Sequence, residues 1–192
     1  YDIYIYIMSM SKAFANVRND VIKVSAMFIV TAVLSGKSLT DKAWQTELMN
    51  TLIGFAAFEL VIARFFDPSM FGKTYTKAVA DIAKVGTMLV VTRVLSGGSL
   101  QDQAWMMSSG ATLAGFTVYN LFVANMIKTG HLKGDAKQIA DDWLKVGTML
   151  IVSHVLKGGD PTDSKFLQSS VNTIVGFNAG DLLDGDALTK LR

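Results

Sequence analysis

The fold is decided by the stretch Lys84-Val-Gly-Thr-Met-Leu-Val-Val-Thr-Arg-Val-Leu-Ser-Gly-Gly98, because the chain contains close copies of it on either side. One copy begins at Lys23 and the other at Lys145, so each lies 61 residues away. The register also holds without a gap beyond the stretch. Identical residues recur at this interval at Lys23, Lys84 and Lys145, at Met27, Met88 and Met149, at Gly36, Gly97 and Gly158, at Asp41, Asp102 and Asp163, and at Gly54, Gly115 and Gly176. An ungapped triplication predicts three copies of one structural unit.

The repeat divides the 192 residues into four parts. We expect an N-terminal extension at residues 1–19, followed by unit one at 20–80, unit two at 81–141 and a truncated unit three with a C-terminal tail at 142–192. Unit three carries polar or small residues where the others are mainly apolar, at Asn178, Gly180 and Asp181. It is therefore predicted to be the atypical terminal repeat, with a polar edge that faces water or a partner.

Each unit reads as a helical hairpin. The first helix is expected at about 20–34, 81–95 and 142–156, and the second at about 47–66, 108–127 and 168–183. Aspartate suits each first-helix start, and a glycine follows each first helix. The predicted fold class is all-α, with three tandem 61-residue hairpin repeats and about six helices. Before the repeat, tyrosine and isoleucine alternate over residues 1–10, a pattern that predicts a short strand.

The composition favours a membrane protein. Charged residues make up 18% of the chain, hydrophobic ones 51%, and the mean hydropathy is +0.36. The apolar part of the second helix covers residues 48–66 in unit one and 111–127 in unit two, lengths that span a hydrocarbon core. Lys23, Lys84 and Lys145 would then extend toward the membrane interface. The prediction is therefore that the hairpins are transmembrane, and a soluble helical array that uses the same apolar faces is the alternative.

A stripe of threonine, glycine and phenylalanine recurs on the second helix. Its members are Thr51, Gly54 and Phe55, then Thr112, Gly115 and Phe116, then Thr173, Gly176 and Phe177. Small residues three apart on a helix allow a neighbouring backbone to come close, and phenylalanine fills the adjacent space. We predict that this stripe is a helix-packing face on all three second helices.

Polar residues also occur inside the apolar segments. One column, midway along the second helix, holds Glu59, Asn120 and Asp181, and another, near the end of the first helix, holds Ala32, Arg93 and His154. Within a membrane, the first column would either line an ion path or join hairpins by hydrogen bonds. The neutral Asn120 favours hydrogen bonding. Arg93 is expected to pair with Glu59 or Asp181 inside the bundle.

The sequence offers no reactive constellation. It has no cysteine and only two histidines, His131 and His154, at no metal-binding spacing. The glycine pairs lack the lysine and serine or threonine of a phosphate loop. We therefore predict no enzyme activity, no metal and no cofactor. A net charge of +2 also argues against a nucleic-acid partner.

The phrases Lys84–Gly98 and Ala111-Thr-Leu-Ala-Gly-Phe-Thr-Val-Tyr119 resemble small membrane-embedded minor capsid proteins of nucleocytoplasmic large DNA viruses of algae and amoebae. The resemblance covers most of residues 20–183. It implies a structural, non-enzymatic virion protein that links the internal membrane to the capsid shell. The implied partners are the lipid bilayer and other capsid or membrane proteins, in an oligomeric assembly.

Two other functions remain open from the residues. One is a small channel or transporter whose polar path contains Glu59, Arg93, Asn120 and Asp181. The other is a soluble helical-repeat scaffold.

Overall fold

The computed structural model describes residues 2–183, except for the side chains of residues 2–9, 135 and 181. Helices and their connecting loops make up this part of the chain, and no strand occurs within it, so the all-α prediction is confirmed. In chain order, the elements are α1 (Asp2–Leu34), α2 (Lys42–Ala57), η1 (Phe58–Ile62), α3 (Ala63–Phe65), η2 (Pro68–Phe71), α4 (Thr76–Leu95), α5 (Gln103–Val118), η3 (Tyr119–Val123), α6 (Ala124–Met126), α7 (Asp135–Leu156) and α8 (Ser164–Leu183).

Several of these elements continue one another. α2, η1 and α3 form one rod over residues 42–65, and α5, η3 and α6 form another over 103–126. With α1, α4, α7 and α8, the described residues contain six rods. η1 and η3 are single π-helical turns, and they contain Glu59 and Asn120. Such turns inside α-helices often mark functional sites.

Glycine and aspartate set the turn inside each hairpin. Gly36, Gly97 and Gly158 have φ values of +68°, +70° and +81°, so each takes the left-handed position after a first helix, as predicted. The next helix begins directly after a capping aspartate. Its carboxylate accepts from a backbone amide 2.9 Å away in each case: Asp41 from Ala43, Asp102 from Ala104 and Asp163 from Lys165. The second helices therefore begin earlier than predicted.

Two local predictions are wrong. The first helices do not start at Asp20, Asp81 and Asp142, because α1, α4 and α7 begin well before these residues. The strand expected over residues 1–10 is also wrong, because residues 2–10 belong to α1, a helix of 33 residues. Continuity with a long helix overrides the weak strand preference of isoleucine and tyrosine. The three aspartates therefore lie inside helices, where their side chains are available for other partners.

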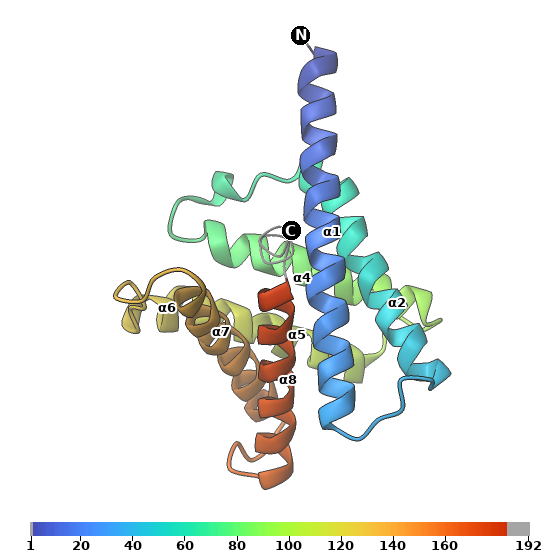
Figure 1. Ribbon diagram of the computed structural model, residues 1–192, viewed down its shortest axis with the longest axis vertical. Helices are drawn as coiled ribbons and strands as arrows, with labels where there is room; N and C mark the ends of the chain where they lie inside the picture. Colours follow the sequence, from blue (N-terminus) through green and yellow to red (C-terminus); the bar gives the residue numbers. More distant parts are fainter. Residues whose placement is uncertain (1, 184–192) are drawn as a thin grey trace.

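The helices pack mainly between hairpins rather than within them. α2 lies along α4, α5 lies along α7, and α8 lies along α1. Figure 1 shows the last of these pairs, with α8 beside the lower half of the long α1. The order of contacts therefore runs around the molecule and closes between the last described helix and the first. Of the polar edge predicted for unit three, Gly180 faces Lys23 of α1, and the side chain of Asp181 lies outside the described residues.

The outer surface is rich in apolar side chains. Within the described residues, exposed large apolar residues outnumber the buried ones. Many recur at equivalent positions of the three first helices: Ile29, Val90 and Ile151, then Val33, Val94 and Val155, then Leu34, Leu95 and Leu156. One described helix, Lys42–Phe65, is long and apolar enough to cross a membrane, and only 28% of its most apolar window is buried. The six membrane spans expected from the sequence thus reduce to one by length and composition.

Candidate functional site

Close contacts between backbones join consecutive hairpins. A Cβ atom on Gly54 would lie 2.8 Å from Met88 Cα, and one on Gly115 would lie 2.6 Å from Met149 Cα. At Gly176 the same atom would lie 2.7 Å from the carbonyl oxygen of Met27. All three distances are too short for a real Cβ atom. The glycines of the predicted packing stripe therefore lie where two helix backbones meet, and each faces the first helix of another unit.

The threonines of the stripe form hydrogen bonds within their own helices and not across the contact between helices. Thr51, Thr112 and Thr173 each donate a hydrogen bond to the carbonyl four residues earlier in their own helix, at 2.8–3.0 Å. Their hydroxyls are thus satisfied locally. The helix seam is therefore free of unpaired threonine hydroxyl groups.

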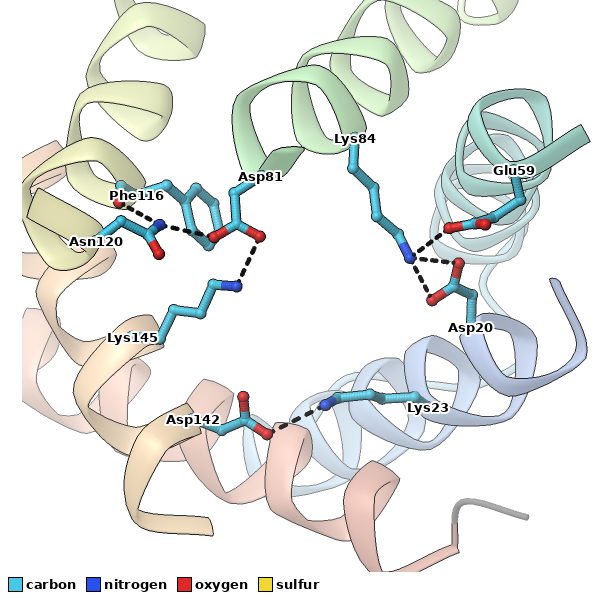
Figure 2. Close-up of polar contacts among 9 residues, drawn as sticks. All are labelled: Asp20, Lys23, Glu59, Asp81, Lys84, Phe116, Asn120, Asp142 and Lys145. Carbon is cyan, nitrogen blue, oxygen red and sulfur yellow. Dashed lines mark hydrogen bonds and ion pairs between the residues drawn. The ribbon is translucent and has the colours of Figure 1, made fainter. Parts of the chain in front are cut away.

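Three lysine–aspartate ion pairs lie inside the bundle and bridge its first helices, as Figure 2 shows. Their N–O distances are 2.8 Å for Lys84–Asp20, 2.7 Å for Lys145–Asp81 and 3.2 Å for Lys23–Asp142. We call these six residues the ion-pair ring. The ring connects α4 to α1, α7 to α4, and α1 to α7, and these helices do not pack backbone to backbone. Direct contact between the three first helices is therefore made by side chains, whereas the second helices join them through backbone contacts.

The sequence predicts that the lysines of the ring extend toward a membrane interface, but in the structure they point at neighbouring helices. Each lies over the phenylalanine of a stripe on a neighbouring helix: Lys84 over Phe55 at 5.6 Å, Lys145 over Phe116 at 5.6 Å and Lys23 over Phe177 at 5.8 Å. A cation is attracted to the electron-rich face of an aromatic ring. The phenylalanines of the stripe therefore position the lysines as well as fill space.

The polar column of the second helices adds further bonds to the ring. Glu59, 7% exposed, accepts from Lys84 Nζ at 2.9 Å and from Asn16 Nδ2 at 2.8 Å. Asn120 donates to Asp81 at 2.7 Å and to the carbonyl of Phe116 at 2.9 Å. Both residues thus join helices by hydrogen bonds. The side chain of Asp181, the third member of the column, lies outside the described residues.

Arg93 does not pair with Glu59, which corrects one of the two sequence-based expectations; the other, a pair with Asp181, involves a side chain outside the described residues. Its guanidinium donates to the Asp102 carboxylate at 2.6 Å and to the carbonyl of Ser99 at 3.1 Å, and it lies 5.9 Å from the centre of the Trp105 ring. Arg93 lies near the end of α4, so the loop that follows brings Ser99 and Asp102 within the length of its side chain. It belongs to the turn of its own hairpin.

His154 occupies the same position in the next hairpin. Its ring stacks on Phe166, with centroids 3.9 Å apart and planes 9° apart, and its Nε2 lies 3.1 Å from the carbonyl oxygen of Asp160. Residue 93 and residue 154 thus each place a flat side chain on an aromatic ring beside the turn. We call this arrangement the turn plug.

The polar groups described above join helices of the chain to one another. In the described part of the chain, no three histidine, cysteine, aspartate or glutamate side chains come together as a metal site would require. Each ring lysine faces a carboxylate, so opposite charges are matched at side chains that are 18–29% exposed. The arrangement can fix the relative positions of helices. Of the residues proposed for an ion path, Glu59 and Asn120 form hydrogen bonds to the ring, whereas Arg93 lies at a turn.

Comparison of the chain with protein-family models, with curated proteins and with solved structures found no match.

Sequence reasoning missed the aspartates of the ring. Asp20, Asp81 and Asp142 recur at the 61-residue interval, three residues before each lysine. Their recurrence is visible in the sequence, but an aspartate that begins a helix accounts for it equally well. The spacing of three residues would also allow each aspartate to pair with the lysine of its own helix. A signal against the helix start was present in the helix-forming residues before Asp81, such as Lys77 to Ala80.

Proposed function

We propose that this chain is a structural, non-enzymatic membrane protein, in which three 61-residue hairpin units close into one ring. We propose further, on the resemblance described above, that it is a minor capsid component of a large DNA virus, placed between the internal membrane and the capsid shell. Its partners would be lipid and other capsid or membrane proteins.

The observation that carries the membrane proposal is the inverted distribution of polarity. Ion pairs lie between helices in the interior, while rows of large apolar residues face outward. Charged groups of membrane proteins face the bundle interior and pair with one another. Large exposed apolar surfaces are rare on monomeric soluble proteins. The rod 42–65 fits the same proposal, because a core helix of a soluble protein would be mostly buried.

The three-unit ring is supported by the spacing of its contacts. The glycine seams, the ion pairs and the lysine–phenylalanine contacts all recur at positions 61 residues apart. In each set, the third contact joins α8 or α7 back to α1. Such closure would give the ring lysine of every unit an aspartate partner.

A pair of matched variants tests the membrane proposal. Ile53 and Leu100 are 44% and 41% exposed, but Ile53 lies near the middle of the apolar helix Lys42–Phe65, and Leu100 lies in the turn after α4. An aspartate in the centre of a membrane-spanning helix costs about 2.5–3.5 kcal/mol. Ile53→Asp should therefore sharply reduce the fraction of protein that stays with lipid vesicles after carbonate washing, and Leu100→Asp should not.

Two outcomes would contradict the proposal. Release of the unchanged protein from vesicles by carbonate would refute membrane integration. Equal retention of the two variants, with a chain that stays monodisperse without detergent, would favour the soluble scaffold. The capsid assignment is tested separately, by carbonate extraction of virions and detection of the protein in the membrane pellet.

A further inference from the structure

The turn plug is missing from the first hairpin, and a pocket lies in its place. The residue that corresponds to Arg93 and His154 is Ala32, which is 2% exposed. Beside it is a cavity of about 200 Å³. Its lining comes from α1, the following turn, α2 and α8, and it includes Met27, Phe28, Ala32, Lys37, Trp44 and Glu47.

Four residues of this pocket differ from those of both other units, and one of them, Phe28, replaces a leucine. Ala32 stands where the others have arginine and histidine, Lys37 where they have Gly98 and Gly159, and Glu47 where they have serine. The changes at positions 32 and 37 are coupled by space. A Cβ atom on Gly98 would lie 2.2 Å from Arg93, and one on Gly159 would lie 2.2 Å from His154. A side chain at position 37 thus competes for space with a long side chain at position 32 in the position that Arg93 and His154 take.

The charged groups of the pocket lie apart from opposite charges in the part of the chain that the structure describes. Among the described residues, neither Lys37 nor Glu47 forms an ion pair. Likewise, no described ring or cation lies against Trp44, whereas Trp105 and Phe166 are both covered. The pocket therefore presents one ammonium, one carboxylate and one open aromatic face above an apolar floor.

We propose that this pocket binds the headgroup of a zwitterionic phospholipid. The phosphate would pair with Lys37, and the ammonium of the headgroup would lie between the Glu47 carboxylate and the face of Trp44. Met27 and Phe28 would contact the beginning of the acyl chains. This inference rests on the proposed membrane function, and the turn between α1 and α2 follows an apolar helix end, where tryptophan favours the interface.

Lipid retention in native mass spectrometry tests the proposal. The full chain is purified in detergent and offered phosphatidylethanolamine, phosphatidylcholine, phosphatidylglycerol or diacylglycerol in separate samples. We expect one zwitterionic lipid per chain to be retained, at least about tenfold more tightly than phosphatidylglycerol, since the ammonium contact is worth one charge-assisted bond. Soluble phosphoethanolamine alone, offered in a further sample, should bind much more weakly.

The decisive variant rebuilds the plug of the second hairpin. Ala32→Arg combined with Lys37→Gly reproduces the residues at 93 and 98, so it is expected to fold. Its affinity for the zwitterionic lipid should fall by at least about tenfold. Lys157→Gln, which removes a turn lysine from the third hairpin, is the control and should retain it.

The outcomes separate this proposal from the membrane function. Unchanged selective binding in the plugged variant would overturn the pocket as the site. Equal retention of phosphatidylglycerol would overturn the role of Glu47 and Trp44, and tight binding of free phosphoethanolamine would overturn a lipid source. If the plugged variant still stays with vesicles after carbonate washing, only the pocket is affected. If the unchanged chain is released, the proposed function itself fails.

Discussion

The glycine seams predict opposite effects for the same substitution at two positions of one helix. Gly110 and Gly115 both belong to α5, but a Cβ atom on Gly110 meets nothing within 4 Å. At Gly115 the Cβ atom would lie 2.6 Å from Met149 Cα and 2.8 Å from its carbonyl oxygen. The obstacle is backbone, so no side-chain rotation relieves it. α5 and α7 would have to separate by about 1 Å to restore ordinary contact.

The magnitudes follow from two separate terms. Replacement of a glycine inside a helix by alanine stabilises by about 0.5–1 kcal/mol, because it reduces the freedom of the unfolded chain. Overpacking costs about 1–3 kcal/mol. Gly110→Ala should therefore raise the free energy of unfolding slightly, whereas Gly115→Ala should lower it. Because the first term applies to both variants, they should differ by the overpacking term alone, about 1–3 kcal/mol.

The assay is reversible unfolding of the purified chain in mixed micelles, followed by circular dichroism. Gly54→Ala gives an independent second case, since its Cβ atom would lie 2.8 Å from Met88 Cα. Gly115→Leu, with a larger side chain, should destabilise at least as much as Gly115→Ala. If Gly115→Ala proves as stable as Gly110→Ala, the close approach of α5 and α7 is not the packing of the protein, and the reasoning is refuted.

Other predictions concern the ion-pair ring and the turns. Lys84→Met should destabilise by about 3–5 kcal/mol, because it leaves two carboxylates without their counter-charge, as unfolding in micelles would measure. Adding Glu59→Gln to Lys84→Met should recover part of that loss, and strictly additive effects would contradict a shared contact. The backbone hydrogen bond from Trp105, together with the Arg93 guanidinium, lowers the pKa of Asp102. The stability that Asp102 contributes is therefore present above its ordinary pKa and is lost as the pH falls through the lowered one. Arg93→Gln should move the pKa of Asp102 upward in a carboxyl NMR titration, and an unchanged value would exclude the ion pair.

The features that the sequence predicted well are local. Helix content follows from uninterrupted apolar segments with few prolines, and the hairpin turns follow from glycines that need positive φ and from aspartates that cap the next helix. Gly36 and Asp41 act only on residues within a few positions of themselves. Their effect can therefore be read without knowledge of the rest of the fold.

The partners of charged residues could not be read in this way. Lys84 has Asp81 three residues before it, but it pairs with Asp20 and Glu59 on other rods. Arg93 was expected to reach a buried carboxylate, but the nearer Asp102 meets its guanidinium first. Which carboxylate a long side chain reaches depends on how the helices are arranged, and a single sequence does not supply that arrangement.

The interior of the bundle supports the proposed association of the helices in lipid. Lipid tails are as apolar as leucine, so burying leucine between helices in a membrane gains little, and close backbone packing with polar contacts must drive association instead. The seams contain glycine against backbone, and the centre contains ion pairs and lysine–phenylalanine contacts. The same centre would be costly to desolvate in water. A soluble protein of this size would instead be expected to place its large apolar residues where this chain places Lys84, Asp81 and Lys145.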